Sequence, residues 1–345
     1  MVQHPKQANP VRIGVKELRL KVRGRNCFEI LVLLVYSLLY HYIHQYIFAA
    51  EVNHDLKRKS DSENSLEHLD NCEVGEIKPL QELSEKYKPS KFGYHPATKQ
   101  KSYLHNHYQT YYPQWLGEYR TKKFKFLEIG LESGQGSLLW KEYFPCAEIW
   151  GLEYNTNGTE TQGARAINVV QGDQGDTEFL NGRLLEDSGG NFDLIIDDGG
   201  HHFEQQAASY KALFSRALNP GGLYIIEDIE TSYWGKGEVM YSKSITRGGC
   251  SNQDTIVNRF KKVVDVINKK FFDNSYSVFG SVDHWIQQIS FAQNLIFIRK
   301  KSMKDCIHEV KYRWSKRLSS DCPANRRNNF KDQRLDRDLK LMCSS

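Results

Sequence analysis

Residues 124–136 read FKFLEIGLESGQG, an apolar run that ends in a turn containing Gly130, Gly134 and Gly136. The run predicts a short buried strand, and the next segment, QGSLLWKEYF at 135–144, has the apolar spacing of a helix. Glycines between a strand and a helix let the backbone approach a ligand closely at the amino end of that helix. We therefore predict a cofactor site at this turn.

The same alternation of strand and helix continues toward the carboxyl terminus. A final antiparallel hairpin is predicted over SVFGSVDHWIQQISFAQNLIFI at 277–298. Strands that alternate with helices indicate an α/β, Rossmann-like fold, here a mostly parallel seven-stranded sheet with helices on both faces. The carboxyl ends of the parallel strands then meet at one edge, where ligands bind. The further strands are expected at EIWGLEY (148–154), INVVQGD (167–173), FDLIID (192–197) and GLYIIED (222–228).

Two cofactor classes fit the first half of this pattern, a nicotinamide dinucleotide and S-adenosylmethionine. The second predicted strand ends near Glu153, 23 residues after Gly130, where an acidic residue accepts hydrogen bonds from a ribose diol. The dinucleotide fingerprint is Gly-x-Gly-x-x-Gly. This chain instead has acid-x-Gly-x-x-x-Gly-x-Gly, beginning at Glu128. The glycine spacing disfavours the dinucleotide.

Ionisable residues gather after the fourth and fifth predicted strands. FDLIIDDGGHH at 192–202 places Asp197, Asp198 and His201 after one strand, and Glu227 and Asp228 close the other. Carboxylates this close raise one another's pKa unless they point apart or a cation lies among them. Oxygen ligands of this kind suit Mg²⁺. His201, presented by the Gly-Gly turn, is a candidate general base for a hydroxyl proton.

The motifs together resemble a known family. The acid-glycine turn resembles motif I of the class I S-adenosylmethionine-dependent methyltransferases. IIDDGGHH and the later LNPGGLYIIEDIETSYW at 218–234 are similar to the metal-dependent sugar O-methyltransferases of macrolide and tetracenomycin-type biosynthesis. LEIG, SLLWKEYFP and GDQGD occur in matching order, and the resemblance runs from about residue 94 to residue 300.

The resemblance implies a role for each site residue. Asp198, Glu227 and Asp228 are expected to hold Mg²⁺, with His201 as the base. The implied acceptor is a hydroxyl of a sugar or glycan-like small molecule. Cofactor-binding residues are expected to be Glu128, Gly130, Gly134, Gly136, Glu153, Asp173 and Asp197. Two departures are that Gly200 stands where Ser is commoner, and that Glu230 lies within the ED-x-x-TSYW stretch.

The net charge of +5 is unevenly placed. Residues 1–26 carry seven Lys/Arg and one Glu, and residues 301–345 carry twelve Lys/Arg and six Asp/Glu, so each end is +6. The middle of the chain, 27–300, is then 5 − 6 − 6 = −7. A nucleic-acid-binding groove would place its basic residues on the folded domain instead. We therefore expect no nucleic-acid partner.

The amino-terminal part predicts a membrane attachment. Residues 28–50 are apolar enough to span a bilayer if their polar aromatics lie at the interface, and the basic leader 1–26 favours an uncleaved signal-anchor over a cleaved signal peptide. The expected location is a single-pass membrane protein with a luminal catalytic domain, with secreted or organellar locations as alternatives. The expected order is leader 1–26, anchor 27–50, polar stem 51–78, methyltransferase domain 79–302 and basic tail 303–345.

The seven cysteines include no Cys-x-x-Cys pair and so no zinc-type spacing. Their spread favours mostly free thiols and leaves a Cys306–Cys322 disulfide open. Two functions besides methyl transfer stay under consideration. One is a membrane-tethered binding protein that kept the fold without turnover, and the other is a nicotinamide-dependent oxidoreductase. The oligomeric state and the identity of the acceptor are not determined by these patterns.

Overall fold

The computed structural model describes residues 69–95, 98–101, 108–155, 166–235, 238–240, 243–245, 248–271 and 276–309. The chain divides into two units, Met1–Asn64 and Ser65–Ser345, and every described residue lies in the second. The predicted leader 1–26, the predicted anchor 27–50 and most of the predicted stem 51–78 lie outside the described residues.

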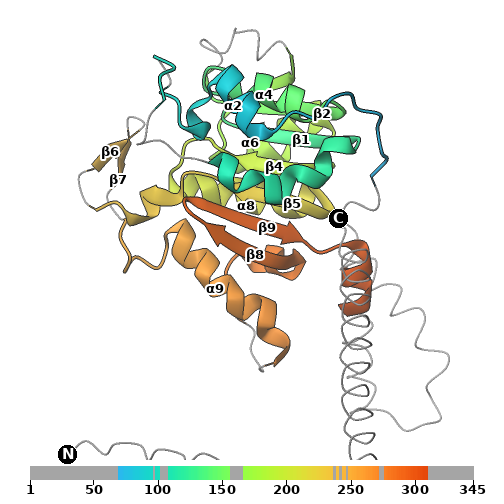
Figure 1. The fold of residues 1–345 in the computed structure, drawn as a ribbon. Coiled ribbons are helices and arrows are strands. Elements are labelled where there is room, and N and C mark those ends of the chain that lie inside the picture. Colours follow the sequence, from blue (N-terminus) through green and yellow to red (C-terminus); the bar gives the residue numbers. More distant parts are fainter. Residues whose placement is uncertain are drawn as a thin grey trace, which may run out of the picture. The chain divides into compact units, whose positions relative to one another are not determined.

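A seven-stranded sheet forms the centre of the second unit, with the order β3-β2-β1-β4-β5-β9-β8 (Figure 1). β1 to β5 pair in parallel, whereas β9 is antiparallel to both β5 and β8. The predicted fold class is therefore confirmed, including the closing hairpin. The strands of the sheet are β1 (Phe124–Ile129), β2 (Ala147–Glu153), β3 (Asn168–Gln171), β4 (Phe192–Asp197), β5 (Leu218–Ile226), β8 (Ile286–Ala292) and β9 (Leu295–Lys300).

Helices cover both faces of the sheet, as predicted. The helices on one face are α2 (Leu80–Tyr87), α3 (Tyr112–Leu116) and α4 (Gln135–Tyr143). Those on the other are α6 (Thr177–Asn181), α7 (Arg183–Ser188), α8 (Phe203–Arg216) and α9 (Ile256–Asn268). Short 3-10 turns and a separate two-stranded ribbon complete the described elements: η1 (Ser90–Phe92), η2 (Tyr108–Thr110), η3 (Gly117–Thr121), η5 (Ile229–Tyr233), β6 (Glu238–Met240), β7 (Lys243–Ile245), η6 (Lys269–Phe271) and η7 (Gly280–Trp285).

Strand alternation produces two separate apolar cores. All six residues of β4 are buried, because helices pack on both sides of this central strand. Leu194 and Ile196 point to the core under α2, α3 and α4, whereas Ile195 points to the core under α8 and α9. The same parity therefore decides which face each polar side chain takes at the end of a strand.

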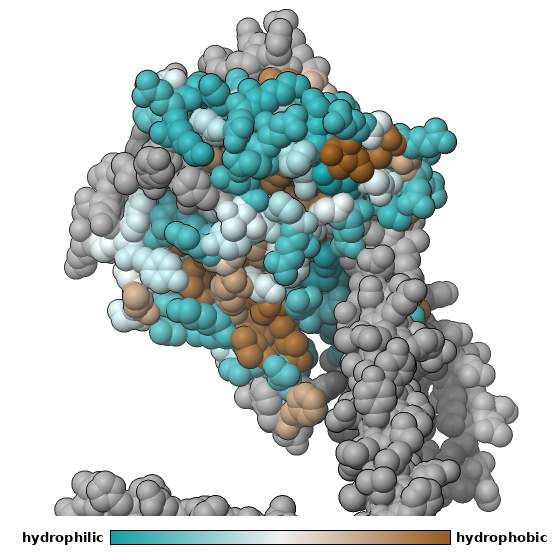
Figure 2. Space-filling model, viewed as in Figure 1, coloured by the Kyte–Doolittle hydropathy of each residue, from teal (hydrophilic) through white to brown (hydrophobic). Residues whose placement is uncertain are grey.

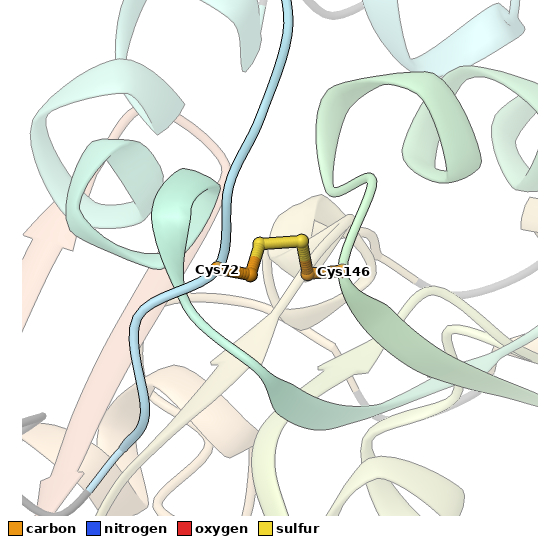
Figure 3. Close-up of a disulfide and its surroundings, with 2 residues drawn as sticks. All are labelled: Cys72 and Cys146. Atoms are coloured by element: carbon orange, nitrogen blue, oxygen red, sulfur yellow. A yellow bond between two sulfur atoms is a disulfide. The ribbon is translucent and has the colours of Figure 1, made fainter.

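Residues 69–79 are attached to the domain, which corrects the expectation that the whole of 51–78 is a loose stem. The backbone of Cys72 donates to the carbonyl of Thr121, and Lys123 donates to the carbonyl of Asp70, both at 2.8 Å. A disulfide joins Cys72 to Cys146, just before β2, with the Cα atoms 6.4 Å apart (Figure 3).

The expectation of mostly free thiols is therefore wrong for the described cysteines. Cys306 is also disulfide-bonded, and Cys250 is free and exposed. Cys322, the partner suggested for Cys306, lies outside the described residues. Spacing alone had no means of revealing the Cys72–Cys146 pair, because its two members are 74 residues apart in sequence.

The first residues beyond β9 also pack on the domain rather than leaving it. Lys301 pairs with Glu309, and Gln287 in β8 donates to Asp305 at 2.9 Å. Figure 2 shows a mainly hydrophilic surface on the viewed face, with apolar patches between the polar areas. Among the described residues, no helix combines the length and the apolar character that crossing a bilayer requires.

Candidate active site

Three carboxylates meet where β1, β4 and β5 end. In the parallel register Asp197 of β4 lies beside Ile226 of β5, so Asp198 and Glu227 follow at the same height. Glu128 on β1 points to the same face of the sheet, toward α4. Glu128 and Glu227 are 1% and 0% exposed, so this is a buried acidic cluster rather than a solvated surface.

Asp197 takes the opposite face, as strand alternation predicts. Its carboxylate is buried under α8 and accepts hydrogen bonds from Gln174, Ser209 and Tyr224. The predicted cofactor role of Asp197 stays a prediction, and these bonds give the carboxylate a second role in holding β4 to α8 and to the loop after β3.

A buried lysine lies among the three carboxylates of the first face. Lys91 Nζ is 2.7 Å from Glu128 Oε1, 2.8 Å from Asp198 Oδ2 and 3.1 Å from Glu227 Oε1. The lysine comes from η1, between α2 and the glycine turn, and its neighbour Phe92 packs edge-on against Trp140. Sequence reasoning missed Lys91, because nothing in the local pattern SKFG distinguishes it from a surface lysine.

Two tyrosines hold the acids at the end of β5. Tyr112 donates its hydroxyl to Glu227 Oε1, and Tyr108 donates to Asp228 Oδ1. Asn294, between β8 and β9, also donates to Asp228 Oδ1 at 3.2 Å. The two tyrosines belong to a dense aromatic segment in the sequence. Tyr108 and Tyr112 are buried in the core and also position the two carboxylates.

His201 lies beside the cluster, as predicted. The Asp-Asp-Gly-Gly turn brings its Nε2 to 3.6 Å from Asp228 Oδ2, and the side chain is 7% exposed. Its backbone has a φ of 55° and its carbonyl accepts a hydrogen bond from Thr231 at 2.6 Å, which fixes the turn. Donor atoms of Asp198, His201 and Asp228 all lie within 4.8 Å of one another, a spacing that a metal ion can bridge.

Burial controls the charge of this cluster. It raises the pKa of Asp198 and of Asp228, and together with the neighbouring acids it raises the pKa of Glu227 well above its usual range. Burial also raises the pKa of Glu128, against the opposing effect of Lys91. For Lys91 burial acts in the other direction, but the surrounding carboxylates outweigh it and raise the pKa well above its ordinary value. The lysine is therefore a fixed positive charge.

The glycine turn after β1 is shaped by its neighbours. Gly130 has a φ of 85°, and a Cβ there would lie 2.1 Å from the carbonyl oxygen of Asp198, so only glycine lets the β1 and β4 ends approach this closely. Gly134, with a φ of 74°, caps the amino end of α4. A Cβ on Gly136 would meet Glu128 Oε1 at 3.4 Å, an ordinary contact, so this position lies next to the acidic cluster but does not itself require glycine.

The remaining predicted cofactor residues lie on the β2 and β3 side. Glu153, at the end of β2, accepts from the backbone of Leu131 at 2.8 Å and from Asn155 at 3.1 Å. Asp173, after β3, accepts from the backbone of Gly175 at 2.7 Å. The sheet order therefore places these two acids on the β2 and β3 side of β1, whereas the acidic cluster spans the β1–β4 switch point and extends to β5.

Comparisons with known proteins find relatives among named O-methyltransferases. No family model matches the chain. It is 38% identical over 168 residues to mycinamicin VI 2''-O-methyltransferase of Micromonospora griseorubida, an alignment that covers 46% of this chain and 38% of that protein. Over 203 residues it is 30% identical to 8-demethyl-8-alpha-L-rhamnosyl tetracenomycin-C 2'-O-methyltransferase of Streptomyces olivaceus, covering 56% of this chain and 50% of that protein.

The solved structures support the same relationship. A structure of the MycE methyltransferase in complex with Mg and SAH is 30% identical, with a TM-score of 0.53, and covers 66% of this chain and 55% of that one. This chain contains a class I methyltransferase domain. It is homologous to the macrolide and tetracenomycin sugar O-methyltransferases, as the motifs predicted. A further MycE structure holds Mg, SAH and mycinamycin VI, at 32% identity and a TM-score of 0.52, and covers 65% of this chain and 54% of that one.

The methyltransferase domain accounts for only part of each relative, since the chain spans half the length or less of the two curated relatives. The predicted membrane location is wrong. The relatives are named for methylation of mycinamicin and tetracenomycin compounds, and the described residues include no helix suited to crossing a bilayer. The predicted anchor at 27–50 itself lies outside the described residues.

Proposed function

We propose that the chain is an S-adenosylmethionine-dependent, Mg²⁺-assisted O-methyltransferase that acts on a hydroxyl of a sugar or glycan-like small acceptor. The observation that carries the proposal is the buried cluster at the ends of β4 and β5, with His201 beside it. The named activities of the relatives and the Mg and SAH in the MycE structures support it.

The residues present fit a magnesium ion. Asp198 and Asp228 would supply oxygen ligands, as the sequence predicted, and their donor atoms are already within bridging distance. Glu227 Oε2 is buried with no hydrogen-bond partner among the described residues, as expected of a third carboxylate ligand without its ion. His201 falls within the same group, but Mg²⁺ prefers oxygen, so we assign His201 to proton transfer.

The glycine turn and the acids beyond it fit S-adenosylmethionine. Gly130 and Gly134 shape the turn, and Glu153 and Asp173 are positioned on the β2 and β3 side for the ribose and adenine ends. When bound, this cofactor supplies an activated methyl group on a sulfonium. The chain's part is to align it with the acceptor.

The protein's own groups then perform a short sequence of tasks. Asp198, Glu227 and Asp228 fix the position of the acceptor end of the site, and the two tyrosines hold the last two of these acids in place. When bound, Mg²⁺ lowers the pKa of a nearby hydroxyl. His201 Nε2 would accept the hydroxyl proton as the methyl group passes from sulfur to the oxygen, the carbon–sulfur bond breaking with its electron pair left on the neutral sulfur. Asp228 would stabilise the imidazolium that results.

A methyl-transfer assay tests the proposal. The full chain is incubated with S-adenosylmethionine labelled in the methyl group and a panel of deoxysugar and glycoside acceptors, with Mg²⁺ or with EDTA. We expect labelled product with Mg²⁺ and at least a hundredfold less with EDTA or with His201→Gln. Equal transfer by wild type and His201→Gln would contradict the assigned role of the histidine.

The two alternative functions gain no support. An oxidoreductase would reduce or oxidise a nicotinamide, and the turn after β1 lacks the dinucleotide spacing. A binding protein without turnover has no physical need for a histidine beside a buried acidic cluster. Mixing the full chain with NADH and following its fluorescence gives a direct check, and we expect no change.

A further inference from the structure

Lys91 is the feature of the site that the proposed reaction leaves unexplained. Its Nζ contacts one oxygen from each of three carboxylates, at 2.7 to 3.1 Å, and its side chain is 6% exposed. The Trp140 ring lies beneath it at 5.7 Å from ring centroid to Nζ. A buried ammonium is costly unless it is paired, and here the three acids provide that pairing.

The three partners of Lys91 are of two kinds. Asp198 and Glu227 are proposed metal ligands, whereas Glu128 is outside the proposed metal set and also accepts a hydrogen bond from Trp140 Nε1 at 2.8 Å. The lysine therefore has a counter-ion of its own and also shares two acids with the metal. It uses Asp198 Oδ2 and Glu227 Oε1, whereas Glu227 Oε2 has no hydrogen-bond partner in the part of the chain that the structure describes.

We propose that Lys91 is a resident cation of the metal site. Its ammonium offsets part of the negative charge that Asp198 and Glu227 would offer a metal ion, and it thereby weakens the affinity of the site for divalent cations. The inference rests on the proposed function in one respect, since it requires Asp198 and Glu227 to be ligands. Lys91 is a positioning and charge-setting residue rather than one that touches the reacting atoms.

The electrostatic argument has a definite sign. A positive charge a few ångströms from a divalent cation repels it, and burial strengthens that repulsion because the effective dielectric constant is lower than in water. Removing the ammonium therefore tightens metal binding if the acids keep their places. A lysine with only a structural role would give the opposite result, because its loss would let the acids move apart.

Calorimetric titration of the full chain with Mg²⁺ alone, and with Mn²⁺ alone, measures this directly. We expect Lys91→Met to lower the Kd for each ion by about tenfold or more. The melting temperature of the same variant should rise more steeply with added Mg²⁺ than that of wild type, because a tighter ligand stabilises the folded state more. Neither measurement depends on methyl transfer.

Two matched variants separate charge from structure. Lys86→Met removes a half-exposed lysine whose partner is Glu142 on the surface, and we expect wild-type affinity. The double variant Lys91→Met/Glu128→Gln removes the ammonium together with its own counter-ion, so the net charge of the cluster is unchanged. We expect its Kd to return to within about threefold of wild type, and its folding is easier to preserve because Glu128 is not left as a buried acid without its counter-ion.

The outcomes are distinct. Metal binding that is unchanged or weaker in a folded Lys91→Met protein would overturn the role of Lys91 alone. So would a double variant whose metal affinity is more than tenfold weaker than that of Lys86→Met. Metal binding that survives Asp198→Asn in every background would contradict the proposed ligand set. No binding of either ion by wild type or by Lys91→Met would contradict both the proposed metal function and this inference.

Discussion

Asp198 lies at the centre of the contacts in the site. It directly follows β4, on the side of the sheet that faces α4, and it contacts Lys91 at 2.8 Å. It also lies within bridging distance of Asp228 and His201. Burial raises its pKa, so its charge depends on the cations around it. A single carboxylate therefore contacts Lys91 and lies next to both the proposed metal position and the proposed base, His201.

We expect Asp198→Asn to reduce methyl transfer by at least a thousandfold while the melting temperature stays within a few degrees. The amide keeps the shape of the side chain but cannot supply the charge that a divalent cation requires. Initial rates with saturating S-adenosylmethionine and acceptor measure the effect. Asp187→Asn, a change at an exposed acid of α7, serves as the control and should leave the rate unchanged.

Tyr112 is the second residue whose replacement is informative. We expect Tyr112→Phe to weaken Mg²⁺ binding by about tenfold, because Glu227 loses a charge-assisted hydrogen bond that holds it in place. Burial raises the pKa of Tyr112 well above its usual range, so its hydroxyl stays a donor at neutral pH. Tyr111→Phe changes the adjacent half-buried phenol and is the matched control. Equal Mg²⁺ affinity in the two variants would contradict a positioning role for Tyr112.

At the scale of elements, the parallel sheet brings the three acids of the site together. Glu128, Asp198 and Glu227 come from three neighbouring strands, and strand parity turns all three toward α4. These acids were predictable because apolar runs locate the strand ends and parallel strands share one edge. The partners from η1, η2 and α3 were not, since their positions depend on packing between elements that local sequence does not encode.

The far edge of the sheet contains a second buried lysine with a different role. Lys300, the last residue of β9, donates to the carbonyls of Ser215 at 2.9 Å and Leu218 at 2.6 Å. Burial lowers its pKa to about 7. In the unfolded chain the same lysine stays protonated up to about pH 10.4. Between these values the unfolded state binds more protons, so the stability of the fold rises with pH.

We therefore expect the free energy of unfolding to increase from pH 7 to pH 9 by up to about 1.4 kcal/mol per pH unit from this group. Lys300→Met should remove that slope, because the apolar side chain has no proton to lose. Urea denaturation at several pH values for wild type and variant gives the difference directly. Parallel pH dependence in the two proteins would contradict the assignment.

For the whole molecule, the segment before β1 acts as a structural part of the site. α2 and the turns that follow it supply Lys91, Tyr108 and Tyr112, and residues 70–72 run along the domain before them. The disulfide between Cys72 and Cys146 joins this segment to the start of β2. Sequence reasoning placed the domain start at 79 because composition changes there, but attachment is decided by backbone hydrogen bonds and a covalent link that composition does not report.

We expect Cys72→Ser to lower the free energy of unfolding by about 2–4 kcal/mol, since the link closes a long loop in the unfolded chain. Urea denaturation of the full chain without reductant measures it. Cys250→Ser, a change at a free and exposed thiol, should have no effect. A reductant should lower the stability of wild type by at least as much as Cys72→Ser does, because it also reduces the disulfide of Cys306. A wild-type curve unaffected by reductant would count against this contribution.

The central claim is that the cluster at the ends of β4 and β5 binds a divalent metal which methyl transfer requires. Calorimetric titration of the full chain with Mg²⁺, in the presence of S-adenosylmethionine, tests it most directly when wild type is compared with Asp198→Asn. The account predicts one saturable Mg²⁺ site in wild type and none in Asp198→Asn, with S-adenosylmethionine binding retained in both. Equal Mg²⁺ binding by the two proteins, or none by wild type, would contradict it.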